Sequence, residues 1–213
     1  MILRYIIKVM ILKIDPENIK PWYIKQVCRV LRLGGIIVYP TDTTYGLGCN
    51  IHDTRALEKI YQIKQQKRGK PFSFICSGIA DIGNYAYVSN TAFKIIKRIL
   101  PGPFTIILEA ARNVPKILQT KQKTVGIRIP DNPIALEIVR ELGHPIISTT
   151  LVSDDEKDYI DPIEIADRYG KQLDIIIDSG LISNELSTVI SLVGDDIRIL
   201  RHGKGADDLL IKI

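Results

Sequence analysis

Residues 34–49 read GGIIVYPTDTTYGLGC, an apolar run followed by a segment rich in threonine, glycine and tyrosine. The run from Ile36 to Tyr39 is typical of a buried strand, and Pro40 ends it because proline has no amide proton to donate to a sheet. The glycines after it permit close approach of the backbone to a ligand, and the hydroxyls of Thr41, Thr43 and Thr44 can orient small polar groups. Local composition alone favours an ordinary turn, because loops rich in threonine and glycine are common.

Apolar runs that predict strands recur along the chain and alternate with helical patterns. Besides 36–39, the predicted strands are 72–76, 104–108, 125–129, 146–148, 175–177, 189–192 and 197–200. The predicted helices cover 21–33, 91–100, 134–142 and 162–169. The last two follow Asn132-Pro133 and Asp161-Pro162, pairs that favour a helix start. This alternation predicts a layered α/β fold.

Composition is ordinary for a soluble globular protein: 213 residues, 46% hydrophobic and 25% charged. A chain of this length predicts a single domain over residues 1–213. The formal net charge of +5 favours anionic partners such as nucleotides or nucleic acid, although a lysine-rich solvated surface would explain it as well.

The cysteines and the N-terminus indicate a cytoplasmic protein without a membrane segment. Cys28, Cys49 and Cys76 stand far apart, and His52 beside Cys49 supplies too few ligands for zinc. We therefore expect reduced thiols and no metal site. The N-terminal stretch MILRYIIKVMILKI is apolar, but its three basic residues interrupt it, so we expect neither a membrane helix nor a targeting segment.

The usual enzyme signatures are missing from the sequence. Neither the P-loop pattern G-x-x-x-x-G-K-[ST] nor the dinucleotide pattern G-x-G-x-x-G occurs, and H-E-x-x-H and G-x-S-x-G are absent too. The sequence therefore argues against P-loop ATPases, Rossmann dehydrogenases and the common hydrolases.

A basic cluster, KQQKRGK at 64–70, carries four cations in seven residues at a predicted helix end, just before the strand at 72–76. Such cations could stabilise a triphosphate and the charge that develops in adenylyl transfer. A cation run is often only a solvated face, but ligands of open α/β sheets bind near strand ends. Both interpretations stay open.

In the segment KTVGIRIP at 123–130, apolar residues alternate with others, so that Val125, Ile127 and Ile129 share one face of the predicted strand. Thr124, Gly126 and Arg128 share the face opposite the apolar residues. An arginine on the inner surface of a sheet can hold a substrate carboxylate with two hydrogen bonds, and the alternative is a structural ion pair.

Taken together in chain order, PTDTTYGLG, KPF, PGPFT, TVGIRIPDNP and PIISTT closely resemble the YrdC/YciO family, and STVI and ILR extend the match. The resemblance covers about residues 12–201. It implies a YrdC-like α/β fold, a twisted mixed parallel and antiparallel sheet flanked by helices, with a concave basic cavity. Synthases of this family join L-threonine, bicarbonate and ATP into L-threonylcarbamoyladenylate and release pyrophosphate. The product feeds the t6A modification of adenosine 37 in tRNA.

The resemblance also assigns roles to individual positions. Substrate binding falls to Thr41, Arg128, Ser148 and Ser187, with Thr41 and Arg128 holding threonine. Nucleotide binding falls to Lys64, Lys67, Arg68, Thr124, Thr150 and Arg201, and Lys64 is also the candidate catalytic residue. ATP is expected to arrive with Mg²⁺ and without a metal site on the protein. The implied partners are tRNA or double-stranded RNA and the downstream threonylcarbamoyl transferase machinery, with no membrane.

Three positions depart from the synthase pattern. The synthases carry a K-x-R pair where this chain has Gln66, a histidine at Ile75, and an S-x-N element that ends here at Val152. These losses resemble the YciO branch and leave a second interpretation, an RNA- or nucleotide-binding protein with weak or no synthase activity. The resemblance starts just after Met10, which suggests an alternative start there with residues 1–9 as an upstream extension.

Overall fold

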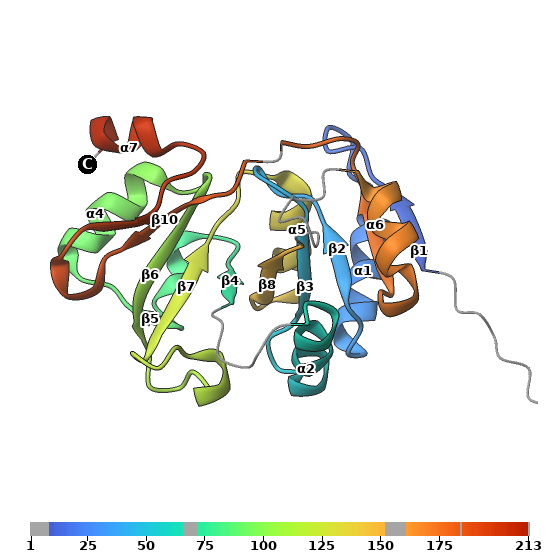
Figure 1. Ribbon diagram of the computed structural model, residues 1–213, viewed down its shortest axis with the longest axis horizontal. Coiled ribbons are helices and arrows are strands. Elements are labelled where there is room, and N and C mark those ends of the chain that lie inside the picture. The colour runs from blue at the N-terminus through green and yellow to red at the C-terminus, as the bar shows by residue number, and fades with distance from the viewer. Residues whose placement is uncertain (1–8, 66–71, 152–160, 184, 213) are drawn as a thin grey trace, which may run out of the picture.

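The computed structural model describes residues 9–65, 72–151, 161–183 and 185–212, which build one mixed sheet with helices on its faces (Figure 1). The strands are β1 (Met10–Lys13), β2 (Ile37–Tyr39), β3 (Gly46–Asn50), β4 (Ser73–Ile75), β5 (Ala86–Tyr87), β6 (Phe104–Ala110), β7 (Thr124–Arg128), β8 (Ile146–Thr150), β9 (Ile175–Asp178), β10 (Thr188–Ser191) and β11 (Arg198–Arg201). The helices are α1 (Pro21–Arg32), α2 (Thr54–Ile63), α3 (Ile79–Ile82), α4 (Asn90–Ile99), α5 (Pro133–Leu142), α6 (Pro162–Tyr169) and α7 (Ala206–Lys212).

The sheet combines parallel and antiparallel pairs, as predicted. Its strand order is β1-β9-β2-β3-β8-β4-β7-β6-β10-β11, and β5 pairs with β6 outside this path. The pairs β1 with β9, β2 with β9, β4 with β7 and β6 with β10 are parallel, and the others are antiparallel. Neighbours in the sheet are therefore often far apart in the chain.

All eight predicted strands are confirmed within two residues of their ends, and one expectation about a loop needs correction. The segment after Pro40 was expected to be a loop through Cys49, yet Gly46–Asn50 forms β3 and pairs with β2 and β8. The composition of this segment does not predict a strand, because two of its five residues are glycines and glycine is depleted in strands. The loop proper is confined to residues 40–45.

The predicted helix boundaries rest on side-chain caps that the structure contains. The carboxamide oxygen of Asn132 accepts from the amide of Ala135 at the start of α5, and Asp161 accepts from Ile163 at the start of α6. Proline is the first residue of both helices, where its missing amide proton costs nothing. Gly143 ends α5 at a φ of 82°, a conformation that glycine adopts without strain.

Two apolar cores lie on opposite faces of the sheet. The larger contains buried residues of α2, α4 and α6, and the smaller contains those of α1 and α5, which pack against each other. On the face of the smaller core, strand register aligns Tyr39 with Gly46 and Ser148 with Gly48 and Ser73. The same face continues beyond α1 and α5 over β4, β7, β6 and β10, where the candidate site lies.

The three cysteines are unpaired and buried. Burial is the main cause that raises the thiol pKa of Cys28 to about 11 and that of Cys49 to about 12, and it also raises the pKa of Cys76. These thiols therefore stay protonated in the folded protein. Within the described ranges, the helices lack the length and apolar composition needed to cross a bilayer.

Candidate functional site

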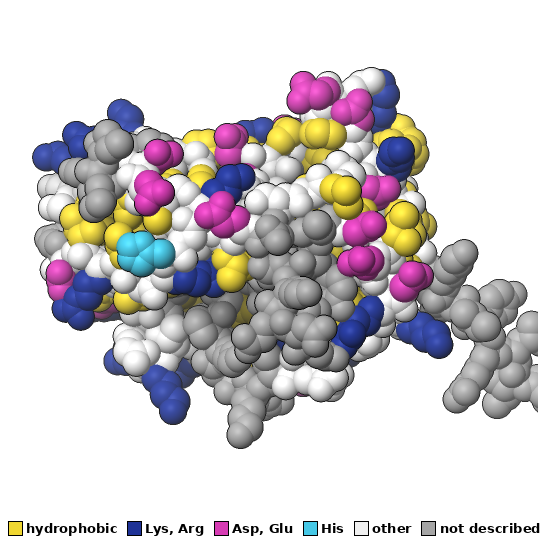
Figure 2. Space-filling view, turned by 45° about the horizontal axis from the view of Figure 1, so that its top comes forward, with side chains coloured by type: hydrophobic (Ala, Val, Ile, Leu, Met, Phe, Trp, Pro, Cys, Tyr) yellow, Lys and Arg dark blue, Asp and Glu magenta, His cyan; other side chains and the backbone are white. Residues whose placement is uncertain are grey.

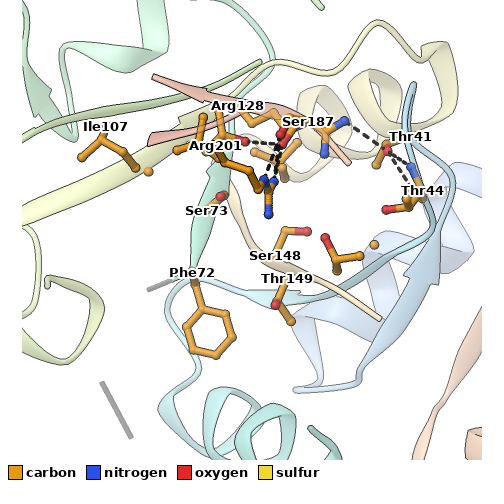
Figure 3. A pocket seen from close by; sticks show the side chains of 16 residues that line it. Thr41, Thr44, Phe72, Ser73, Ile107, Arg128, Ser148, Thr149, Ser187 and Arg201 are labelled. Carbon is orange, nitrogen blue, oxygen red and sulfur yellow. Dashed lines mark hydrogen bonds between the residues drawn. The ribbon is translucent and has the colours of Figure 1, made fainter. Parts of the chain in front are cut away.

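A cavity opens on the sheet face just described and encloses about 770 Å³, including space that is open to solvent (Figure 3). Strands from both halves of the sheet line it. The polar lining consists mainly of serine and threonine hydroxyls, the apolar lining is Phe72, Ile75, Ile107 and Val189, and the charged lining residues are Arg128 and Arg201.

Arg128 lies at the end of β7 and is only 8% exposed. Its Nη2 donates to Oδ1 of Asp42 at 2.5 Å, to Oγ1 of Thr43 at 2.7 Å and to Oγ1 of Thr41 at 3.3 Å. Nε of Arg128 and Oδ2 of Asp42 are buried without a hydrogen-bond partner among the described residues. The sequence left open whether Arg128 binds a substrate carboxylate or forms a structural ion pair. The structure is compatible with both roles, because Arg128 pairs with Asp42 and also lines the cavity with part of its guanidinium unsatisfied.

Thr41 organises the loop between β2 and β3. Its hydroxyl donates to the carbonyl of Thr44 at 2.6 Å and accepts from the amides of Thr43 at 3.2 Å and Thr44 at 3.3 Å. A threonine hydroxyl that bonds to backbone a few residues on forms a compact turn. Thr41 thus shapes the loop that presents Asp42 and Thr43 to Arg128.

The floor of the cavity comes from the middle of the sheet. Ser148 on β8 lies beside Ser73 on β4, and Ser73 in turn lies beside Gly126 on β7. A Cβ atom at Gly126 would stand 3.2 Å from Oγ of Ser73 and 3.4 Å from the carbonyl of Phe72. The glycine therefore keeps the floor open between the two halves of the cavity.

The C-terminal strands close the opposite wall. Arg201 on β11 donates from Nε and Nη2 to the carbonyl of Ser187 at 3.1 and 2.9 Å, and from Nη2 to the hydroxyl of Ser187 at 3.1 Å. The hydroxyls of Ser187 and Thr105 are 2.9 Å apart. Nζ of Lys204 reaches across to the loop and donates to the carbonyl of Asp42 at 2.6 Å. Figure 3 shows Arg201 and Ser187 together at this side of the cavity.

Lys64 borders the cavity from the end of α2. It is half-buried, and its Nζ donates to the carbonyl of Thr150, a residue of the cavity wall, at 2.5 Å. The other predicted cations of this cluster, Lys67 and Arg68, lie outside the described residues. Lys64 thus lies at the edge of the cavity, whose charged lining residues are Arg128, paired with Asp42, and Arg201.

Thr124 is the predicted site residue that the structure separates from the cavity. It is absent from the described lining, and its hydroxyl lies 2.6 Å from that of Thr120. Thr124 and Arg128 share a face of β7 but stand four residues apart, about 13 Å at roughly 3.3 Å per residue. Its predicted contact with nucleotide phosphates therefore finds no support in this geometry.

Asp42, Lys204 and Tyr39 take part in the site without having been predicted. Asp42 lies inside the motif that the sequence singled out, where only its threonines were considered. Lys204 follows the last recognisable motif, and nothing in the local sequence indicates its contact with a loop 162 positions away. Tyr39 reads as an ordinary core residue of a strand, yet its hydroxyl donates to Oγ of Ser148.

Ile75 forms part of the cavity wall and is almost fully buried. It stands where the synthase pattern has a histidine, so this position contributes apolar surface and no titratable group. Gln66 and Val152, the other two departures, lie outside the described residues. No cluster of three or more histidine, cysteine or acidic residues suited to a metal ion occurs in the described part of the chain.

Comparisons with known proteins agree with this architecture. The family model described as telomere recombination, for Sua5, YciO and YrdC proteins, matches residues 29–203. The protein YciO of Escherichia coli is 41% identical over 194 residues, which covers 90% of this chain and 94% of that protein. The E. coli YciO crystal structure gives a TM-score of 0.88 at 39% identity and covers 92% of this chain and 96% of that one.

Two relatives carry a name or ligand that bears on activity. The threonylcarbamoyl-AMP synthase of Mus musculus is 30% identical over 157 residues, 74% of this chain and 55% of that protein. The crystal structure of P. abyssi Sua5 complexed with L-threonine gives a TM-score of 0.87 at 26% identity and covers 96% of this chain and 62% of that one. The chain thus spans little more than half the length of these two proteins.

Proposed function

Because this chain belongs to the Sua5/YciO/YrdC family, we propose that its cavity binds L-threonine, bicarbonate and ATP and produces L-threonylcarbamoyladenylate, with release of pyrophosphate. The product is the activated intermediate for t6A37 modification of tRNA, delivered to the threonylcarbamoyl transferase machinery. Relatives named threonylcarbamoyl-AMP synthase support the reaction class, and a Sua5 structure with bound L-threonine supports the substrate.

The observation that carries the proposal is the state of Arg128. Its Nη2 is held by Asp42 and two threonine hydroxyls, while its buried Nε has no partner among the described residues. A buried guanidinium with an unused donor is costly unless a ligand or water satisfies it. A carboxylate accepts strong, charge-assisted hydrogen bonds from a guanidinium, so the α-carboxylate of an amino acid suits the donors of Arg128 that Asp42 and the two threonines leave unused.

In this proposal, ATP binds near the remaining basic residues of the site, Lys64 and Arg201. Lys64 and Thr150 border one side of the cavity and Arg201 the other, which suits a triphosphate chain lying across the floor. Lys67 and Arg68, outside the described residues, remain proposed phosphate ligands. Mg²⁺ would enter with ATP, because metal ions in such sites are commonly held by phosphate oxygens and water with few protein ligands.

The chemistry needs positioning and charge stabilisation more than a general base. The neutral amine of threonine first forms an N–C bond, either to CO₂ with loss of a proton or to bicarbonate with loss of water, and gives N-carboxy-threonine. One oxygen of that carboxylate then forms a bond to the α-phosphorus of ATP, while the bond from the α-phosphorus to the bridging oxygen breaks and pyrophosphate leaves. A carboxylate nucleophile carries no proton to remove. Cations around the cavity would stabilise the charge on the phosphoryl oxygens, with Lys64 in the candidate catalytic role.

A second candidate function follows from Ile75 and from the relationship to YciO. An apolar residue replaces the synthase histidine in the cavity wall, and E. coli YciO covers nearly the whole chain at 41% identity. These observations favour a nucleotide- or RNA-binding protein with weak or no turnover. On the face shown in Figure 2, basic and acidic side chains of the described residues are interspersed, without one continuous basic strip for an RNA backbone.

Pyrophosphate release separates the two candidates. We expect release from ATP and Mg²⁺ that requires both threonine and bicarbonate, with the adenylate product identified by mass spectrometry. Arg128→Lys should weaken threonine binding by about tenfold or more, because one ammonium group cannot replace a five-donor guanidinium that has to hold Asp42, the threonines and a ligand carboxylate together. Arg140→Lys, at an exposed arginine of α5, is the matched control and should change nothing.

Absence of threonine-dependent release, together with no threonine binding in the presence of a non-hydrolysable ATP analogue, would refute the synthase proposal. The RNA-binding alternative would then require tRNA affinity whose logarithm falls linearly with the logarithm of salt concentration.

A further inference from the structure

Tyr39 on β2 is fully buried, and its ring crosses the neighbouring strand β3. A Cβ atom at Gly46 would lie 2.9 Å from ring atoms of Tyr39, and one at Gly48 would lie 3.0 Å from the ring. Side chains at these two positions would collide with the ring. The two glycines therefore let the phenol pass over β3 and reach Ser148 on β8, two strands away.

The hydrogen bond between these residues has a defined direction. The Tyr39 hydroxyl donates to Oγ of Ser148 at 2.5 Å. A phenol is a better donor and a poorer acceptor than an alkyl hydroxyl, because its oxygen shares electrons with the ring. The described structure offers the phenolic proton no other acceptor, so the reverse direction would bury that proton unsatisfied. Burial raises the pKa of Tyr39 to about 12, although the bond to Ser148 opposes this, so the proton is present at neutral pH.

Ser148 is consequently left with a proton to donate. Its oxygen accepts from Tyr39, and no acceptor for its own proton occurs among the described residues. Ser148 lines the cavity and is 6% exposed, so the remaining hydrogen-bonding capacity of the hydroxyl is available to a ligand there (Figure 3).

We infer that Tyr39 is a positioning residue, which orients the Ser148 hydroxyl as a donor toward an anionic oxygen of the bound substrate. The inference rests on the proposed function and refines it. In the proposed reaction that oxygen belongs to the carboxylate or the N-carboxy group of threonine. The Ser148 proton is thus kept for an acceptor on the ligand, although the second lone pair of its oxygen remains able to accept. Tyr39 thereby contributes to the orientation of the amino acid without touching it.

The test measures threonine affinity by calorimetry, with a non-hydrolysable ATP analogue and Mg²⁺ present and with folding checked by circular dichroism. Tyr39→Phe should weaken threonine binding by about threefold to tenfold, the net worth of one hydrogen bond. Ser148→Ala should weaken it at least as much. Because Tyr39 acts through Ser148, the double variant should bind no more weakly than Ser148→Ala alone.

Tyr45→Phe is the matched control. It removes another buried phenol, one that donates to the carbonyl of Gly180 at 2.7 Å and is not among the described lining residues, and it should leave threonine affinity within about twofold. The inference is overturned if Tyr39→Phe leaves threonine affinity unchanged, or if the two losses of affinity add up in the double variant. In either case the proposed function stands as long as the wild-type protein binds threonine. If Tyr39→Phe does not fold, Ser148→Ala takes its place: unchanged threonine affinity in that variant overturns the inference but not the proposed function. A wild-type protein that binds no threonine overturns both.

Discussion

Removal of the carboxylate beside Arg128 should destabilise the protein far more than removal of a surface carboxylate. Asp42 and Arg128 are each about 9% exposed, and their ion pair joins Oδ1 to Nη2 at 2.5 Å. With the two charges about 4 Å apart, their attraction is about 4 kcal/mol at an effective dielectric constant near 20. Breaking a buried pair by removing one partner typically costs about 3–5 kcal/mol, because the remaining charge is left uncompensated.

The expected loss for Asp42→Ala lies at the low end of that range. The hydroxyls of Thr41 and Thr43 still accept from Arg128, and the cavity admits water to the guanidinium. We expect a decrease in the free energy of unfolding of about 3 kcal/mol, which corresponds to a melting temperature lower by about 6–12 °C for a chain of this size. Urea unfolding followed by far-ultraviolet circular dichroism measures it, with a lower midpoint at an unchanged slope.

Glu137→Ala is the matched control, since Glu137 pairs with Arg140 one helical turn away on α5 and both are about half exposed. Exposed pairs of this kind contribute about 0.5 kcal/mol or less. A loss for Asp42→Ala within about 0.5 kcal/mol of the loss for Glu137→Ala would show that solvent already compensates Arg128. A ligand would then not be needed at its unpaired Nε either.

Three further outcomes follow from contacts of the same site. Lys64→Ala should weaken binding of an ATP analogue, measured by calorimetry, by about one to two factors of ten, because a charge-assisted phosphate contact is worth about 1.5–3 kcal/mol. An unchanged affinity would show that the basic segment 64–70 is only a solvated face. Lys204→Met should weaken threonine binding by a few-fold with little effect on ATP, because the lysine holds the carbonyl of Asp42 and thereby the loop at Arg128; equal losses for both ligands would contradict this role. Tyr39 has a higher pKa in the folded protein than in the unfolded chain, so its contribution to the free energy of unfolding is fully present below about pH 10 and is lost as the pH rises toward 12. Wild type should therefore lose about 1–3 kcal/mol of stability relative to Tyr39→Phe over this window in urea titrations, and parallel pH profiles of the two proteins would exclude it.

The sequence alone determined the class of the fold and the face on which Arg128 lies. Apolar runs bounded by proline and glycine predicted most of the strands, because a half-buried strand has to alternate and a turn has to break the pattern. The alternation in TVGIR placed Arg128 opposite the apolar residues of β7, and the structure has it in the cavity wall. The Asx-Pro pairs located the starts of α5 and α6, since a cap acts within one turn of helix.

The tertiary structure alone decided which side chains meet. Alternation assigns a residue to a face but not to a place along it, so Thr124 shared the face of Arg128 and still lies outside the cavity lining. Tyr39 meets Ser148, and Lys204 meets the backbone of Asp42, across 109 and 162 positions of the chain. Such contacts depend on strand order and register, which arise when distant strands pair and bury their apolar faces together. Local sequence cannot specify them, because the energy that selects them belongs to the assembled sheet.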